Sequence, residues 1–494
     1  MSFVYAGIKV RKNLPAAIRD LFVVDEHNKT DPATGRVNVY RRITYYDSDL
    51  GYNVYVASKK IGEVGDNGKI IPILRKKSPH RKEVPDSMGA IAEKATDSLS
   101  DKRQQAKVIY PMPLVMDIAL MAAMSGVTGS SGVAIYWKTN FDVLKQKWGF
   151  DMPDQIPTKQ TINRLLQLIE PSELQKLYQE LVFPFMPHAV HPKESKPIIA
   201  VDGQVVRASR NYQDRQHQFL SFYCTDTGIA FYQKLIDSKS NEKPAALELA
   251  QRLDLRGTIV TADAMHCDRK LVRVLMENAR ADYCLAVKMN QSKTAEAIET
   301  AFNSDNEAKC GTVKDKDHGR EEVRTTYVLP GKLLPASILK KWYGLEFGSI
   351  VKQVSERAIV KTGEKSVQTR YYISSLCPES DTIVENIQRA VRGHWGIENK
   401  LHHVLDVDFY QDATNAKNAN YVCNISQINK FALAVLEVVR RRLAKDHGMK
   451  ALMPIKAMNL SLQNKPELAT EYLDIFVRES VAAACDQSPE PLTV

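Results

Sequence analysis

Two short apolar segments that each end in an aspartate restrict the fold of this chain more than any other feature. Residues 198–201 (IIAV) lead into Asp202, and residues 258–262 (TIVTA) lead into Asp263. Apolar and β-branched runs of this kind predict buried strands. A carboxylate that closes such a strand needs a partner, because burial of an unpaired charge is costly. We therefore expect both aspartates at a sheet edge where functional side chains are exposed.

The predicted elements around these aspartates follow the order β-β-β-α-β-α-β. The three first strands include a hairpin joined at an Asp-Thr-Gly turn, and a helix precedes each later strand. The segments are 198–203, 217–226, 228–237, 245–255, 258–264, 267–279 and 282–288. This order predicts a mixed sheet flanked by helices, as in the RNase H-like fold, for a catalytic domain at 195–440.

A third acidic residue, Glu398, lies in the segment RGHWGIENKLHHVLDV, which is compatible with a long helix. On that helix Trp395 and Ile397 are expected to pack against other elements. The chain between Asp263 and Glu398 is far longer than one helix and one strand require. Its middle is rich in β-branched and aromatic residues, so we predict a β-rich insertion at about 305–376, before the catalytic helix.

The three acidic residues together offer oxygen ligands for a pair of hard divalent cations. Two ions about 3.5–4 Å apart support in-line attack on a phosphodiester. Asp202, Asp263 and Glu398 are therefore the predicted catalytic and metal-binding residues, although either aspartate alone would be an ordinary strand-end residue. Zinc held by His394, Glu398 and His402 on one helix face is an alternative, but the spacing lacks the H-E-x-x-H arrangement.

The bulk composition is compatible with this chemistry. The 494 residues carry a formal net charge of +10, which favours a polyanionic partner. Seven cysteines without a C-x-x-C pair predict neither a disulfide framework nor a zinc knuckle. The amino-terminal segment does not resemble a secretory signal, and the apolar stretch 113–127 is interrupted by Asp117 and too short for a bilayer. We expect a cytoplasmic protein without a membrane segment.

Residues 1–95 are predicted to form a β-rich basic module that binds DNA. Aromatic and β-branched runs flank an Asp-Ser-Asp-Leu-Gly turn, as in a hairpin. Lys76 and Lys77 belong to a basic stretch between Lys59 and Lys82 that is suited to a phosphate backbone. A solvated loop with an excess of lysine is the alternative.

Helical periodicity characterises two regions. Residues 108–190 are predicted to form a helical DNA-binding domain associated with the catalytic domain, and residues 441–494 are predicted to form a helical carboxyl-terminal tail. In the first region, a helix that starts after Thr158 would present Lys159 and Asn163 to DNA as a recognition helix. Helix packing without nucleic acid explains the same pattern equally well.

Other polar residues near the predicted site are candidates for DNA contacts. Some follow the strand 282–288, others lie in the insertion, and the rest flank Glu398. They are Lys288, Asn290, Gln291, His318, Arg320, Arg324, Arg392, His394, Lys400 and His402. Basic side chains there would hold phosphates. For Arg320, Glu322 and Arg324, which share one strand face, a surface ion-pair ladder is the alternative.

Five motif blocks, in chain order, resemble those of DDE-type insertion-sequence transposases, most closely the H-repeat-associated branch. They are AVDGQ, TADAMH, VKMNQ, HGREEVR and HWGIENKLHHVLDVDFYQDA, within about residues 110–440. The resemblance implies an RNase H-like fold and a catalytic triad at Asp202, Asp263 and Glu398. It also implies two Mg²⁺ ions, for which Mn²⁺ substitutes, and a cut-and-paste reaction.

The same resemblance implies partners and a location. Double-stranded DNA, as transposon ends with terminal inverted repeats and as target DNA, is the expected substrate. A homodimer or larger synaptic complex is the expected assembly, in the bacterial cytoplasm at the nucleoid. The first 90 residues resemble the amino-terminal module of other transposases with the same type of insertion.

The chain departs from the wider group around the glutamate. That group often has a tyrosine and an arginine before the glutamate and a lysine after it. Here Val391, His394 and Leu405 occupy these positions, so those roles do not transfer. Arg392 and Lys400 are candidate substitutes.

A transposase that binds element ends, cleaves them and joins their 3′-hydroxyls to target DNA is the predicted function. A stand-alone nuclease on the same fold is one alternative, which would cut without a joined product. A domesticated DNA-binding protein that has lost catalysis is another, and the presence of all three carboxylates disfavours it.

Overall fold

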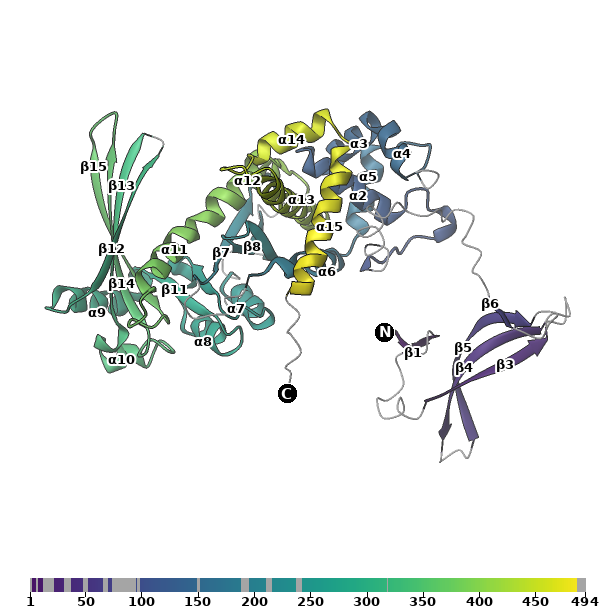
Figure 1. The fold of residues 1–494 in the computed structure, drawn as a ribbon, viewed down its shortest axis with the longest axis horizontal. Coiled ribbons are helices and arrows are strands. Elements are labelled where there is room, and N and C mark those ends of the chain that lie inside the picture. Colours follow the sequence, from purple (N-terminus) through teal and green to yellow (C-terminus); the bar gives the residue numbers. More distant parts are fainter. Residues whose placement is uncertain are drawn as a thin grey trace. The chain divides into compact units, whose positions relative to one another are not determined.

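A computed structural model describes the fold (Figure 1). The described residues are 2–5, 8–11, 22–30, 37–47, 52–64, 70–72, 95, 98–148, 152–187, 195–209, 216–236, 242–317 and 319–486. The chain divides into two compact units, Met1–Glu83 and Val84–Val494.

The first unit contains short antiparallel strands. β1 (Ser2–Tyr5) pairs with β2 (Ile8–Arg11). A four-stranded sheet has the order β3-β4-β5-β6. Its strands are Phe22–Thr30, Val37–Asp47, Tyr52–Val64 and Ile70–Pro72. Lys76 and Lys77 lie outside the described residues, and a basic DNA-binding module here stays a prediction.

A nine-stranded mixed sheet is the centre of the second unit, which confirms the predicted mixed α/β class. Its order is β12-β13-β14-β15-β11-β10-β7-β8-β9. β7, β10 and β11 are parallel neighbours, whereas β8 and β9 continue from β7 as antiparallel strands. The main strands are β7 (Ile198–Val206), β8 (His217–Cys224), β9 (Ile229–Ile236), β10 (Ile259–Ala262) and β11 (Asp282–Val287).

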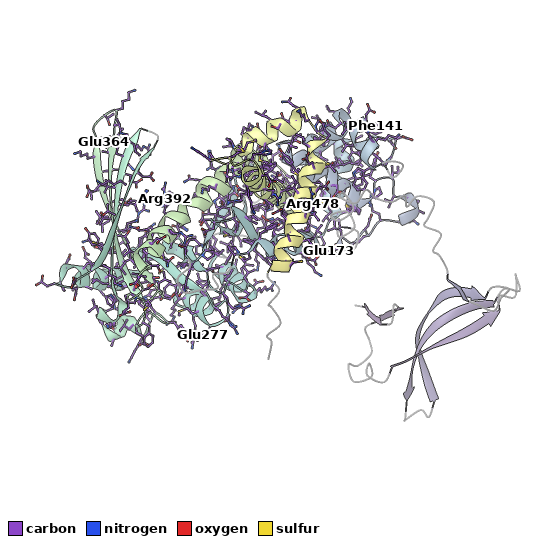
Figure 2. The ribbon with its side chains drawn as sticks, in the orientation of Figure 1. Phe141, Glu173, Glu277, Glu364, Arg392 and Arg478 are labelled. Carbon is purple, nitrogen blue, oxygen red and sulfur yellow. The ribbon has the colours of Figure 1, made fainter. Side chains whose placement is uncertain are left out.

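Four antiparallel strands lie within the range predicted for the insertion and extend the main sheet through the pairing of β15 with β11. They are β12 (Lys309–Asp317), β13 (Arg320–Pro330), β14 (Ser349–Ile359) and β15 (Lys365–Ser374). Glu364 marks the end of one of their two hairpins (Figure 2). We call these four strands the blade.

The long helix α11 (Ile383–Gly396) covers one face of the sheet. Side chains alternate along each strand, so Ile198, Ile259 and Cys284 pack under Ile387 of α11, while their neighbours in sequence belong to the larger core on the other face. A Cβ atom on Gly393 would lie 3.2 Å from Ile198, so the absence of a side chain lets α11 approach β7 closely.

The remaining helices complete the layers. Crossover helices α7 (Glu242–Arg252) and α8 (Arg269–Glu277) separate the parallel strands, and α9 (Ser292–Asn303) and α10 (Ala336–Leu339) accompany the blade. A helical region packs around α13 (Ala419–Asp446). Its other members are α2 (Met112–Met124), α3 (Gly129–Thr139), α4 (Phe141–Trp148), α5 (Lys159–Leu168), α6 (Pro171–Val182), α14 (Ile455–Asn464) and α15 (Leu468–Asp486).

The helix α5 begins where it was predicted to begin, whereas α13 crosses a predicted domain boundary. α5 begins after Thr158, whose hydroxyl accepts a hydrogen bond from the Thr161 amide at 3.2 Å, as expected of a helix cap. Its apolar positions Ile162 and Leu165 are buried. In contrast, the boundary predicted at residue 440 falls inside α13, which continues to Asp446.

The apolar character of α13 is accounted for by packing. By length and composition the helix is able to cross a membrane, but 94% of its apolar window is buried inside the protein. The pair α2 and α3 passes the same test only as one span, although the two helices are bent by 95°. Core helices satisfy such criteria as readily as membrane helices do.

Candidate active site at the strand ends

The two aspartates lie on neighbouring parallel strands. Asp263 directly follows β10, as predicted, whereas the prediction that Asp202 ends its strand is wrong, because β7 continues to Val206. β7 and β10 pair at Val201 and Ala262, so Asp202 and Asp263 follow at the same level of the sheet. Because side chains alternate along a strand, both aspartates point to the face that α11 covers. Both line one cavity with residues of α11, including His394.

Glu398 reaches this face from a π-helical segment. Residues Ile397–His402 form this segment between α11 and α12 (His403–Val407). Its Ile397 and Leu401 are buried and anchor the segment, which leaves Glu398 exposed toward the strand ends. π-helical turns are rare and often occur at functional sites.

The expectation that His394, Glu398 and His402 share one helix face holds for Glu398 and His402 but not for His394. The π-helical turn changes the helical phase after α11, and the two imidazoles face different aspartates. His394 Nε2 lies 3.5 Å from Asp263 Oδ1. His402 Nδ1 lies 3.5 Å from Asp202 Oδ2 and 3.6 Å from Glu398 Oε2. A zinc site of both histidines with Glu398 is therefore not assembled.

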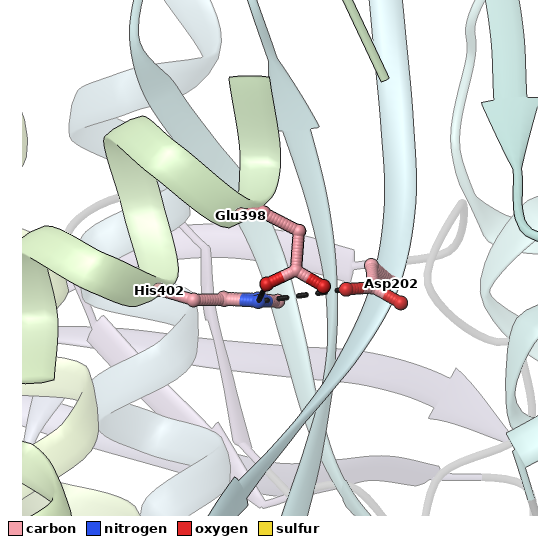
Figure 3. Close-up of side chains that lie close together, drawn as sticks. All are labelled: Asp202, Glu398 and His402. Atoms are coloured by element: carbon pink, nitrogen blue, oxygen red, sulfur yellow. Dashed lines mark ion pairs between the residues drawn. The ribbon is translucent and has the colours of Figure 1, made fainter. Parts of the chain in front are cut away.

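Asp202, Glu398 and His402 form a compact cluster, shown in Figure 3. One potential ligand atom from each of them lies within 4.8 Å of the others. The Asp202 Oδ2 atom is buried and has no hydrogen-bond partner among the described residues. Such an atom is costly unless a cation or a proton compensates for it.

The electrostatics of the cluster follow from burial and crowding. Burial, with a further contribution from the Glu398 carboxylate, raises the pKa of Asp202 to about 8. The nearby His402 imidazole lowers the pKa of Glu398, and burial lowers the pKa of His402. Two carboxylates beside an imidazole that burial keeps neutral form a site that a cation would stabilise.

Asp263 has a different environment. It is half-exposed, and the interaction with His394 lowers the pKa of its carboxyl group. The other ring nitrogen of His394 lies 3.4 Å from the Thr261 hydroxyl, which fixes the ring orientation. His394 therefore positions Asp263, and the predicted direct contact of His394 with DNA has no support from this geometry.

One cavity of about 220 Å³ joins all three acidic residues. The same cavity is also lined by Lys288, Arg370 and Trp395, and we call Lys288 and Arg370 its basic wall. The Arg370 guanidinium lies 5.5 Å from the centre of the Trp395 ring. Trp395 was expected to pack against other elements; it contacts Arg370 of β15, but 45% of the residue is exposed. Arg370 was not predicted, since only the pairing of β15 with β11 brings it here.

Asn290 and Gln291 support the Asp263 loop. The Asn290 side-chain amide donates to the Ala264 carbonyl at 2.7 Å, and the Gln291 amide donates to the Cys267 carbonyl at 3.0 Å. These bonds hold the segment directly after Asp263 against the end of β11. The amides predicted to contact DNA thus have structural partners.

The predicted contacts in the blade and on the neighbouring part of α11 differ in whether they are buried in ion pairs or exposed. Arg324 is only 8% exposed and donates to Asp315 at 2.7 Å and to Glu322 at 2.9 Å, which is the ion-pair arrangement considered as the alternative. Arg392 lies 3.8 Å from Asp315 and is exposed near the blade (Figure 2). Arg320 is exposed. His318 lies outside the described residues.

The other predicted DNA contacts differ in their exposure. Lys400 and Lys159 are exposed. Asn163 is partly buried and accepts a hydrogen bond from Gln167, one turn further along α5. His402 is buried, so its predicted contact with DNA is wrong.

Two family models match the chain. The model described as "DDE_Tnp_1-associated" matches residues 94–182, and the model described as "Transposase DDE domain" matches residues 193–424. The second range contains the sheet strands β7, β10 and β11 and the three acidic residues of the cavity.

Curated relatives agree with these matches. The "H repeat-associated putative transposase YhhI" of Escherichia coli (strain K12) is 31% identical over 348 residues, which cover 68% of this chain and 88% of the relative. The "H repeat-associated putative transposase YbfD" of the same organism is 30% identical over 244 residues, 48% of this chain and 93% of the relative. The chain belongs to the DDE transposase family, and its relatives are of the H repeat-associated kind.

A solved structure also matches at low similarity. The "Cryo-EM structure of piggyBac transposase synaptic complex with hairpin DNA (SNHP)" has a TM-score of 0.34 and 13% identity, and the match covers 83% of this chain and 80% of that chain. A TM-score this low does not establish a shared fold. The predicted family resemblance is confirmed by the family models and curated relatives.

Proposed function

We propose that this protein is a DNA transposase that binds the terminal inverted repeats of an insertion sequence, cleaves at the element ends and joins the 3′-hydroxyl ends to target DNA. One observation carries the proposal: Asp202, Asp263 and Glu398 line a single cavity in a chain of the DDE transposase family. We assign the catalytic triad to these three residues. The strand order β9-β8-β7-β10-β11 supports an RNase H-like core. In it, β9, β8 and β7 are antiparallel neighbours, and β10 and β11 run parallel to β7.

The residues present fit a divalent metal. Asp202 offers a buried oxygen that has no hydrogen-bond partner within the described part of the chain, and Glu398 and Asp263 offer further carboxylate oxygens to the same cavity. We assign two Mg²⁺ ions to the three carboxylates, with Mn²⁺ as a substitute. When bound, such ions lower the pKa of an attacking water or hydroxyl and neutralise charge on the phosphate.

The remaining residues of the cavity hold and orient the reacting groups. Lys288 and Arg370 bring positive charge to the cavity that the carboxylates line, where they would contact the phosphates of a bound strand. His394 fixes the orientation of Asp263. Positioning of this kind accounts for a large part of the rate in phosphoryl transfer.

Double-stranded DNA is the proposed partner, as element ends and as target. The formal net charge of +10 and the family membership support this assignment. Two chains would hold two ends in a synaptic complex, so we propose a homodimer at the bacterial nucleoid in the cytoplasm. Lys76, Lys77, Lys159, Arg320, Arg392 and Lys400 remain proposed contacts with the DNA backbone.

A cleavage and joining assay tests the proposal. Labelled DNA from the flanks of the gene, incubated with the full-length protein, Mg²⁺ and a supercoiled target, should yield cut ends and joined products. Alanine at Asp202, Asp263 or Glu398 should abolish both products while gel-shift binding persists. Cleavage without joining would indicate a nuclease, and binding without metal-dependent cleavage would indicate a domesticated DNA-binding protein.

A further inference from the structure

The imidazole of His402 approaches the two carboxylates of the cluster at nearly equal distances. Its Nδ1 atom lies 3.5 Å from Asp202 Oδ2 and 3.6 Å from Glu398 Oε2 (Figure 3). The side chain is only 6% exposed, and its Nε2 atom has no hydrogen-bond partner among the described residues. The nearly buried ring thus directs Nδ1 into an acidic cluster. Neither ring nitrogen makes a short hydrogen bond to another described residue.

These distances distinguish between two explanations. A charge-assisted hydrogen bond from an imidazolium to a carboxylate has a length of about 2.7–2.9 Å. Two ligands of one divalent ion, each bound at about 2.1 Å, lie about 3.0–3.5 Å apart in octahedral or tetrahedral geometry. The separations from His402 are too long for the hydrogen bond and close to those within a metal coordination shell.

The segment that carries His402 is held in place from behind. The Gln204 side-chain amide donates to Asp406 Oδ1 at 2.9 Å and approaches the backbone carbonyl of His402 at 3.5 Å. Gln411 donates to the Gln204 oxygen at 2.9 Å. These contacts connect β7 with the turn after Glu398, so the ring position is fixed by the fold.

We propose that His402 is a third protein ligand, through Nδ1, of a divalent cation bound by Asp202 and Glu398. This inference rests on the proposed metal-dependent function and makes the two metal positions chemically unequal. Carboxylates suit Mg²⁺ and Mn²⁺, whereas imidazole nitrogen suits the first-row transition metals. An O,O,N ligand set therefore selects Mn²⁺ over Mg²⁺ at this position.

Pulsed electron paramagnetic resonance of the Mn²⁺-loaded full-length protein tests the ligand directly, without DNA. Electron spin echo envelope modulation should show coupling to ¹⁴N, and labelling all histidines with ¹⁵N should convert it to ¹⁵N coupling. This isotope experiment requires no substitution, so it does not depend on the folding of a variant. Bound Mn²⁺ without nitrogen coupling in the wild-type protein would overturn the proposal.

Three substitutions identify the histidine. His402→Gln should abolish the nitrogen coupling and weaken Mn²⁺ binding by about tenfold or more, with a smaller effect on Mg²⁺. His403→Gln, at the exposed neighbouring position, is the matched control and should leave both unchanged. Loss of the coupling in His394→Gln, with retention in His402→Gln, would contradict the assignment. Nitrogen coupling without DNA cleavage would refute the proposed function alone, whereas metal-dependent cleavage without nitrogen coupling would refute this inference alone.

Discussion

The Nζ atom of Lys430 on α13 donates a hydrogen bond of 3.1 Å to the hydroxyl of Ser221 on β8. Ser221 is paired with Asp202 across β7 and β8, so both side chains lie on the same face of the sheet. Lys430 is completely buried and also donates to Gln233 on β9. A buried amine is therefore part of the support behind the acidic cluster.

The first prediction concerns the pH dependence that Lys430 gives to stability. Burial lowers the pKa of Lys430 to about 7. Between pH 7 and the ordinary lysine value, the unfolded chain binds more protons than the folded protein, so the free energy of unfolding rises with pH. Lys430→Met should remove up to about 1.4 kcal/mol of this rise per pH unit. Urea unfolding of both proteins at pH 7 and at pH 9 measures this change in the free energy of unfolding.

The matched control for this prediction is Lys445→Met, because Lys445 is exposed on the same helix. It should keep the wild-type rise. The same rise in Lys430→Met and in the wild-type protein would show that the buried amine does not titrate in this range.

Asp117 provides a prediction of opposite sign. Both of its oxygens are buried in α2 without a hydrogen-bond partner among the described residues, and burial raises its pKa well above the ordinary value. The folded protein then binds more protons than the unfolded chain above that value, so stability falls as pH rises. In urea unfolding measured between pH 5 and 8, Asp117→Asn should reduce the fall of the free energy of unfolding with pH. The same fall in the variant and the wild-type protein would contradict this prediction.

Asp202→Asn should separate stability from activity. Without metal, the substitution should raise the free energy of unfolding by about 1–3 kcal/mol at pH 7, because burial and Glu398 raise the pKa of Asp202 to about 8 and folding must neutralise this group with a proton. Cleavage should fall by at least about 10³-fold. Thermal melts with chelator and with Mn²⁺ provide the check, since the metal should stabilise only the wild-type protein. A destabilised variant without metal would contradict the crowding argument.

Asn290→Ala should lower cleavage through the position of Asp263. Loss of its hydrogen bond to Ala264 removes about 0.5–1.5 kcal/mol of support, so we expect a decrease of up to about tenfold in the cleavage rate. DNA affinity in a gel-shift titration should stay unchanged. Asn303→Ala, at the exposed end of α9, should leave both quantities at their wild-type values. A loss of affinity with an unchanged rate would instead indicate the direct DNA contact.

Lys288→Gln and Arg370→Gln test the basic wall of the cavity. Each should weaken DNA binding for all sequences and reduce the slope of log affinity against log salt by about one. Arg256→Gln, whose guanidinium pairs with Asp254 outside the cavity, is the control. Unchanged salt slopes in both test variants would exclude phosphate contact at this wall.

The strands and their aspartates were predictable because their pattern is local. The apolar runs at 198–201 and 258–262 become parts of β7 and β10. Asp263 directly follows β10, whereas Asp202 lies within β7, which continues to Val206. Glu398 was predictable on a helix for the same reason. The π-helical turn was not, because it depends on the packing of Ile397 and Leu401 against the rest of the fold.

Long-range pairing explains the other differences. Arg370 enters the cavity only because β15 pairs with β11, which no local signal specifies. Arg324 is withdrawn into ion pairs because β12 and β13 place Asp315 beside it. Residue type alone indicated a basic contact, and the strand register decided which arginine remains available.

Anomalous diffraction from Mn²⁺-soaked crystals of the full-length protein tests the central claim most directly. The account predicts anomalous density in the cavity within about 2.2 Å of carboxylate oxygens from Asp202 and Glu398, with Asp263 binding the same ion or its neighbour. Anomalous peaks confined to other surfaces, with these three carboxylates unbound at saturating Mn²⁺, would contradict it.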